Sequence, residues 1–190
     1  MTVSAQALLD ERRPARADAR RNFDALIVAA RAAFAEDGID ASLEDIARRA
    51  GVGIGTLYRN FPTRDALVES VYLGEVADIA ARASDHGDLG PFESFAAWLD
   101  RYTGFAATKR VLLDGLNRDS PVLASCRGVL FDAGEPLLKR AQEAGEARDD
   151  VTIEDAIRLI SGVAGAVYAD PEQRDRVIGI AIDGLRAPRS

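Results

Sequence analysis

Residues 53–60, GIGTLYRN, combine small side chains with hydrogen-bond donors of the kind that contact nucleic acid. Gly53 and Gly55 leave the first turn of a helix with little bulk, so its backbone N–H groups are open to a phosphate and the helix can lie deep in a major groove. The Thr56 hydroxyl can donate to a phosphate or a base edge, and Ile54 can contact a thymine methyl group. The segment therefore predicts a helix that binds double-stranded DNA.

Two short helices and a glycine turn are needed to position this segment. Ala47 suits a close helix crossing because it has only a methyl group, and Gly51 suits a turn that requires a positive φ. Leu57 returns an aliphatic side chain to the shared core. Ser42 can cap the first helix, with Asp45 at the reciprocal capping position, and Ser42 is also a possible phosphate donor. The spacing predicts a helix-turn-helix.

The run from Ser42 to Leu67, which ends in TLYRNFPTRDAL, resembles the DNA-binding signature of the tetracycline-repressor (TetR) family of bacterial transcription regulators. The resemblance covers about a third of the chain when the preceding helix is included. The rest is similar to the family only in length, helical pattern and apolar character. One departure is Gly53, where the family usually has serine or threonine, so a hydroxyl that could cap the helix or bind a phosphate is missing.

The resemblance also implies roles for single residues of the recognition helix. It assigns phosphate contacts to Thr56, Tyr58, Asn60 and Arg64, although Tyr58 could instead only pack against the first helix. Arg59 can reach the DNA backbone, or a guanine if the helix is slightly rotated. Leu57 and Phe61 are expected to face the protein core, and Arg48 and Arg49 to be solvated charges on the positioning helix.

Charge is unevenly divided along the chain. The net charge is −7, but residues 1–64 hold 10 basic and 9 acidic residues, whereas residues 65–190 hold 14 and 22. Local rather than global charge decides what a phosphate backbone meets. Five arginines crowd the start of the chain: Arg12, Arg13, Arg16, Arg20 and Arg21. We predict a flexible basic arm over residues 1–19 that stays solvated in the free protein or becomes ordered on DNA.

Apolar residues recur at helical spacing in the rest of the chain, and strand alternation is not evident. The pattern predicts an all-α fold of about nine helices, with a three-helix DNA-binding domain over residues 20–64. The TetR resemblance implies that residues 65–190 form a helical ligand-binding and dimerisation domain. Besides the helix-turn-helix, the expected helices are 21–36, 63–83, 91–107, 110–117, 121–145, 153–168 and 171–185. Gly38 should end the first of these, Thr63 should cap the second, and Asp170 with Pro171 should begin the last.

Aromatic residues of the second domain are candidates for an effector site, although aromatics at this spacing are more often plain core. The TetR resemblance implies an inducer held within this domain, because family members bind their ligands there. The residues assigned to a ligand cavity are Trp98, Tyr102, Phe105, Cys126, Phe131 and Val163. The chemical nature of the effector is not encoded in any pattern of this sequence.

The last two predicted helices are apolar on more than one side, so each must be covered on two sides. One side packs against the chain's own core. The other side either packs against a partner chain in a twofold-symmetric contact or belongs to a single larger core of the monomer. TetR proteins form a four-helix dimer interface from their last two helices, which favours the partner. The residues assigned to a homodimer interface are Ile157, Ser161, Ala164, Tyr168, Ile178, Ala181 and Leu185.

Catalysis is not predicted. The chain has one histidine, His86, and one cysteine, Cys126, which make neither a metal cluster nor a nucleophile pair. We expect no catalytic residue, metal or cofactor, no membrane span, and a cytoplasmic location suited to a single reduced cysteine. The TetR resemblance implies a repressor that binds a palindromic operator as a dimer and is released by a small-molecule effector. An activator, or an effector that favours the DNA-bound form, is also compatible with it. The alternative is a helical protein-interaction module that has lost DNA binding, which Gly53 favours and the rest of the motif opposes.

Overall fold

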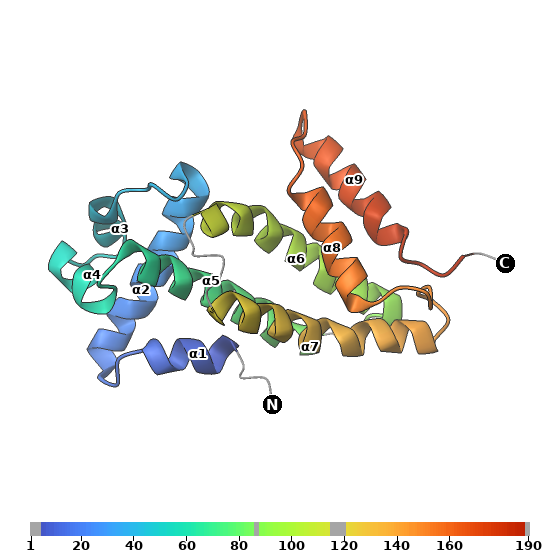
Figure 1. Cartoon of the computed structure of the whole chain (residues 1–190), viewed down its shortest axis with the longest axis horizontal. Coiled ribbons are helices and arrows are strands. Elements are labelled where there is room, and N and C mark those ends of the chain that lie inside the picture. Colours follow the sequence, from blue (N-terminus) through green and yellow to red (C-terminus); the bar gives the residue numbers. More distant parts are fainter. Residues whose placement is uncertain (1–4, 86–87, 115–120, 189–190) are drawn as a thin grey trace. The chain divides into compact units, whose positions relative to one another are not determined.

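The computed structural model describes residues 5–85, 88–114 and 121–188, which form α-helices without a β-strand (Figure 1). His86 lies outside these residues. Packing divides the chain into two compact units, Met1–Ala77 with Thr108–Cys126 and Asp78–Ala107 with Arg127–Ser190. This division differs from the predicted boundary after Arg64, because the helices over residues 64–81, 91–114 and 121–143 each contribute to both units. The helices are α1 Ala5–Arg12, α2 Ala17–Asp37, α3 Leu43–Arg49, α4 Ile54–Asn60, α5 Arg64–Ala81, α6 Pro91–Asp114, α7 Pro121–Glu143, α8 Ile153–Ala164 and α9 Pro171–Asp183, with a 3-10 turn at Arg82–Ser84.

Helices α2, α3 and α4 pack pairwise into the predicted three-helix unit (Figure 1). Of the apolar residues that recur at helical spacing in α2, Phe23, Leu26, Ala30 and Phe34 are buried, and Ile27 is half-buried. Gly38 ends the helix as predicted. Its φ is 78°, and its N–H donates to the Phe34 carbonyl oxygen at 3.1 Å. The helix end therefore has the left-handed glycine that satisfies a final carbonyl group.

The N-terminal segment is not the fully mobile arm that the sequence suggested. Residues 5–12 form α1, and its Ala5 and Leu9 side chains are buried. Arg12 Nη2 donates to Glu69 Oε2 of α5 at 2.8 Å. The sequence interpretation treated Arg12 as a solvated charge, whereas in the structure it pairs with an acidic residue of α5 that lies far away in the sequence.

Within the described residues the number of α-helices equals the predicted number, because two differences from the prediction cancel. A break near Ala107 and a separate helix over residues 110–117 were expected, but α6 continues without interruption to Asp114 within the described residues. The helix α1 restores the count. Helix α8 ends at Ala164, before the expected end at Tyr168, with Gly165 as its C-cap. Thr63 and Asp170 cap α5 and α9 as predicted, since their side chains accept hydrogen bonds from Ala66 N and Gln173 N.

In the second unit, the aromatic residues of α6 form a continuous row. Trp98 stacks against both Phe95 and Tyr102, with ring centroids 6.5 and 6.2 Å apart, and Tyr102 contacts Phe105 at 5.7 Å. The Trp98 indole Nε1 donates to the Ile79 carbonyl oxygen at 3.3 Å. Aromatic pairs in these geometries add to the stabilisation that burial provides. The row is therefore an extended apolar core on one side of α6.

Gly134 lets the Trp98 ring approach α7, and its replacement is expected to be destabilising. A Cβ at position 134 would lie 2.6 Å from both Trp98 Cη2 and Ile153 Cδ1. We expect Gly134→Ala to lower the free energy of unfolding by about 1–3 kcal/mol, because overpacking shifts side chains or backbone. Gly104→Ala is the matched control, since a Cβ there meets nothing within 4 Å, and it should raise stability by about 1 kcal/mol. Urea titrations give the free energy of unfolding of both variants. If both substitutions stabilise the protein equally, Gly134 is not tightly packed against Trp98.

Candidate nucleic-acid interface

The turn between α3 and α4 is closed by two backbone hydrogen bonds that require glycine. Val52 N donates to Ala47 O at 3.0 Å, and Gly51 N donates to Arg48 O at 3.1 Å. Gly51 has a φ of 70°, which places it in the left-handed region. These bonds form a Schellman motif, in which the residue after the C-cap takes the left-handed conformation. The reason given for Gly51 from sequence is confirmed.

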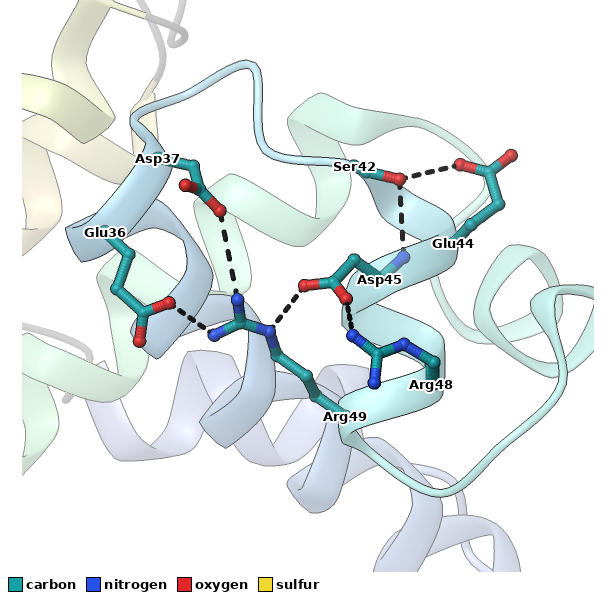
Figure 2. Close-up of polar contacts among 7 residues, drawn as sticks. All are labelled: Glu36, Asp37, Ser42, Glu44, Asp45, Arg48 and Arg49. Atoms are coloured by element: carbon teal, nitrogen blue, oxygen red, sulfur yellow. Dashed lines mark hydrogen bonds and ion pairs between the residues drawn. The ribbon is translucent and has the colours of Figure 1, made fainter.

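Ser42 caps α3 as predicted, but the reciprocal half of the cap is absent. The Ser42 hydroxyl accepts from Asp45 N at 3.3 Å. The Asp45 carboxylate instead accepts hydrogen bonds from Arg48 and Arg49 (Figure 2). These bonds, first from Arg49 and then from Arg48, lower the pKa of Asp45. The expected capping box at Ser42 was wrong on this point, because the two arginines one turn further along α3 compete for the carboxylate.

Arg49 joins α3 to the end of α2. Figure 2 shows its guanidinium between Asp45 and the acidic pair Glu36 and Asp37. Arg49 Nη1 donates to Glu36 Oε2 at 2.6 Å, and this bond is the main cause that raises the pKa of Arg49. Arg49 thus has a structural role within the three-helix unit, whereas the exposed Arg48 pairs with Asp45 of its own helix.

Two apolar anchors determine which face of α4 is exposed. Leu57 and Phe61 are each 1% exposed, as predicted, and the Phe61 ring lies 4.8 Å from the Phe23 ring of α2. Residues two positions before a buried helical residue point to the opposite side, so Gly55 faces outward. Ile54 and Tyr58 are 36% and 48% exposed. Both side chains therefore belong to the exposed face of α4.

The polar side chains of α4 partly bond to their own helix. Arg59 Nε donates to Gly55 O, and Arg59 Nη2 donates to the Thr56 hydroxyl, both at 3.1 Å. Asn60 Nδ2 donates to Thr56 O at 2.8 Å. Within the described residues, the Tyr58 hydroxyl and the N–H groups of residues 53–55 have no partner. The outer face of α4 therefore presents an unpaired hydroxyl, unpaired N–H groups and a guanidinium that no carboxylate neutralises.

Arg64 differs from the expectation. Its Nη1 donates to the carbonyl oxygens of Ile39 at 2.8 Å and Ala41 at 2.7 Å, so the side chain holds the loop that leads into α3. Sequence reasoning assigned Arg64 only to a phosphate and missed this contact, because the loop lies more than 20 positions earlier in the chain. Its phosphate contact stays a prediction.

Comparison with known proteins identifies the architecture. Residues 26–71 match the bacterial regulatory proteins of the tetR family, and residues 90–187 match the C-terminal domain of SbtR-like transcriptional regulators. This chain belongs to the TetR family. The TetR regulator SCO0520 from Streptomyces coelicolor is 36% identical with a TM-score of 0.75, and the match covers 88% of this chain and 99% of that one. A TetR regulator from Mycobacterium vanbaalenii is 32% identical with a TM-score of 0.69, covering 92% and 100%.

This TetR protein is therefore a DNA-binding transcription regulator with a helix-turn-helix and a C-terminal ligand-binding domain. Helices α3 and α4 lie within the matched N-terminal region. No helix in the described ranges is both long enough and apolar enough to cross a membrane. The individual DNA-contacting residues remain predictions.

The residues predicted to line a ligand cavity are mostly packed against other side chains. Trp98, Tyr102 and Phe105 are at most 3% exposed, and Cys126 is fully buried. Cys126 belongs to the first packing unit, whereas Phe131 and Val163 are half-buried residues of the second. A cavity lined by these residues stays a prediction for this TetR chain.

Most of the residues predicted for the dimer interface are covered by the chain's own core. Four of the seven are at most 8% exposed, namely Ile157, Ala164, Ile178 and Leu185. Ser161 is half-buried and bonds to the Tyr102 hydroxyl at 2.7 Å, and the half-buried Tyr168 donates to Val163 O at 2.7 Å. Ala181 of α9 is half-buried as well. The contact of these residues with a partner chain stays a prediction.

Proposed function

We propose that this TetR protein is a repressor that binds a palindromic operator in the cytoplasm as a homodimer. The observation that carries the proposal is the outward face of α4, which exposes Ile54, Gly55 and Tyr58 while Leu57 and Phe61 fix its orientation. A helix held in this way can enter a major groove with its small first turn leading. The donors of α4 supply phosphate contacts, and Ile54 supplies an apolar contact to the groove wall.

A TetR dimer needs an exposed apolar surface, and the last two helices provide one. Leu159 of α8 and Ile180 of α9 are 41% and 70% exposed, and Val167, just after α8, is 96% exposed. Helices α8 and α9 lie side by side (Figure 1). Pairing these faces about a twofold axis would bury the surface and present two copies of α4 to two half-sites. We place the partner contact on these residues and Ala181.

Release from DNA would follow from an effector that binds one conformation of the dimer better than the other. Helix α5 directly follows the helix-turn-helix and continues into the second unit, so it provides the covalent connection along which such a change can be transmitted. The aromatic row of α6 supplies the apolar contacts that an organic effector would need.

Tyr58→Ala tests the assignment of α4. The substitution removes one exposed hydroxyl per protomer, so we expect binding to weaken on the order of tenfold for the dimer, by about the same factor on every sequence. Tyr58→Phe should reproduce most of the loss if the hydroxyl is the contact. Val28→Ala is the control, because Val28 is 68% exposed on α2 of the same unit. Fluorescence anisotropy with a labelled operator measures the affinities, and an unchanged affinity for Tyr58→Ala would reject the assignment.

A protein-interaction module without DNA binding is the alternative, and the wild-type measurement separates the two. Gly53 lacks a capping hydroxyl, yet α4 forms with its exposed face intact. The wild-type dimer is used to select a duplex from a random library, and its affinity for that duplex is compared with its affinity for an unrelated one. Tighter binding to the selected duplex supports the proposal that the protein is a transcription regulator. Equal and weak binding to all duplexes supports the alternative.

A further inference from the structure

Some arginines of residues 5–64 form an ion pair with a carboxylate, and others do not. Within the described chain, six of the ten pair with an acidic side chain: Arg12, Arg13, Arg21, Arg31, Arg48 and Arg49. An arginine held in this way must give up its partner, or bring that negative charge to DNA, before it can neutralise a phosphate. The arginines without a carboxylate partner are Arg16, Arg20, Arg59 and Arg64.

Two of these arginines lie at the start of α2, and an aromatic contact places that end of the helix beside α4. The Phe23 ring lies 4.8 Å from the ring of Phe61, the C-cap residue of α4. Each helical residue turns the direction of its side chain by about 100°, so Arg20 lies roughly 60° from the Phe23 direction and Arg21 roughly 160° from it. Arg20 is therefore on the α4 side of α2, and Arg21 is on the opposite side.

The Arg20 guanidinium is exposed and weakly held. Its Nε lies 3.4 Å from Pro14 O and its Nη2 lies 3.5 Å from Ala15 O, both at the long limit of hydrogen bonding. Arg16, the N-cap residue of α2, is exposed one turn before Arg20. Both positive charges are thus available without loss of an ion pair.

We propose that Arg20 and Arg16 bind DNA phosphate groups that flank the contact made by α4. These contacts would extend the DNA-binding surface from the C-terminal end of α4 to the start of α2. The other arginines of the basic N-terminal segment are not part of this surface. This proposal rests on the proposed function of α4 as the recognition helix. Its ligand is the phosphate backbone, so its effect does not depend on base sequence.

The salt dependence of DNA binding tests the proposal. For Arg20→Ala, we expect the plot of log affinity against log salt concentration to become less steep by about two units for the dimer, because each protomer releases fewer counterions. Affinity at 0.1 M salt should fall on the order of tenfold or more, equally on the selected duplex and on an unrelated one. Arg20→Lys keeps the positive charge and should retain the wild-type slope.

Arg21→Ala is the matched control, because Arg21 is the next residue, is exposed and pairs with Asp18. Its slope should equal that of the wild type. An Arg20→Ala slope equal to the wild-type slope overturns the proposal, and so does an equal reduction by Arg21→Ala, since the segment would then act only through its general charge. If the wild type selects no duplex at all, the proposed function fails instead, so the two failures are distinguishable.

Discussion

Ile180→Asp is expected to convert the protein to a monomer and to weaken operator binding by at least two orders of magnitude. Ile180 is 70% exposed on α9, so the free protomer tolerates the change, but a dimer would bury two unpaired carboxylates in an apolar contact. A monomer presents one copy of α4, which makes too few base contacts for specific binding. Light scattering coupled to size-exclusion chromatography gives the mass, and anisotropy gives the operator affinity.

The control for this dimer test is the same substitution at another exposed apolar residue. Leu89 is 50% exposed just before α6 and lies apart from α8 and α9 in the sequence, so Leu89→Asp should leave both mass and affinity unchanged. Circular dichroism on both variants checks that the fold is retained. A dimeric Ile180→Asp variant with wild-type operator affinity would show that this face of α9 is not the partner contact.

Gly55→Leu should make the protein more stable while weakening DNA binding more than tenfold. A Cβ at position 55 would meet no heavy atom within 4 Å in the described chain, and leucine is a better helix former than glycine by roughly 0.5–1 kcal/mol. The same side chain would project outward from α4 and hold the helix away from the groove floor, because Gly55 lies opposite Leu57. Thermal unfolding and operator anisotropy measure the two opposed effects on one variant.

The control for the groove test is Gly104→Leu, at an exposed glycine of α6 that also has open space around it. It should raise the unfolding temperature without changing operator affinity. Gly55→Ala provides a smaller side chain and should give a smaller loss of affinity than Gly55→Leu. If Gly55→Leu binds the operator as tightly as the wild type, the outward face of α4 does not lie in the groove.

Features of the DNA-binding unit that depend on neighbouring residues were predictable. The roles of Gly38, Gly51 and Thr63 follow from helix-end geometry, which involves residues within about five positions of one another. The burial of Leu57 and Phe61 follows from helical periodicity in the same way. Local sequence encodes such relations because the hydrogen bonds and contacts that enforce them close within one or two turns.

Partners that are distant in sequence were not predictable. Arg12 pairs with Glu69 and thereby helps to hold α1 in place, and Arg49 bonds to Glu36 at the end of α2. Each basic residue had several acidic residues that could have paired with it. Sequence gives the number of charges, whereas only the folded chain brings one particular pair within hydrogen-bond distance.

The amino-acid sequence alone established the helix-turn-helix, its register and the residues of α4 that face outward, because each depends on helical spacing around Gly51 and Leu57. It also showed that α8 and α9 are apolar on more than one side. Which side the chain covers with its own core was decided by tertiary packing, which buries Ile157 and leaves Leu159 exposed. The reason is that an apolar side chain gains the same free energy from burial against its own chain as against a partner, so hydrophobicity alone does not select between the two.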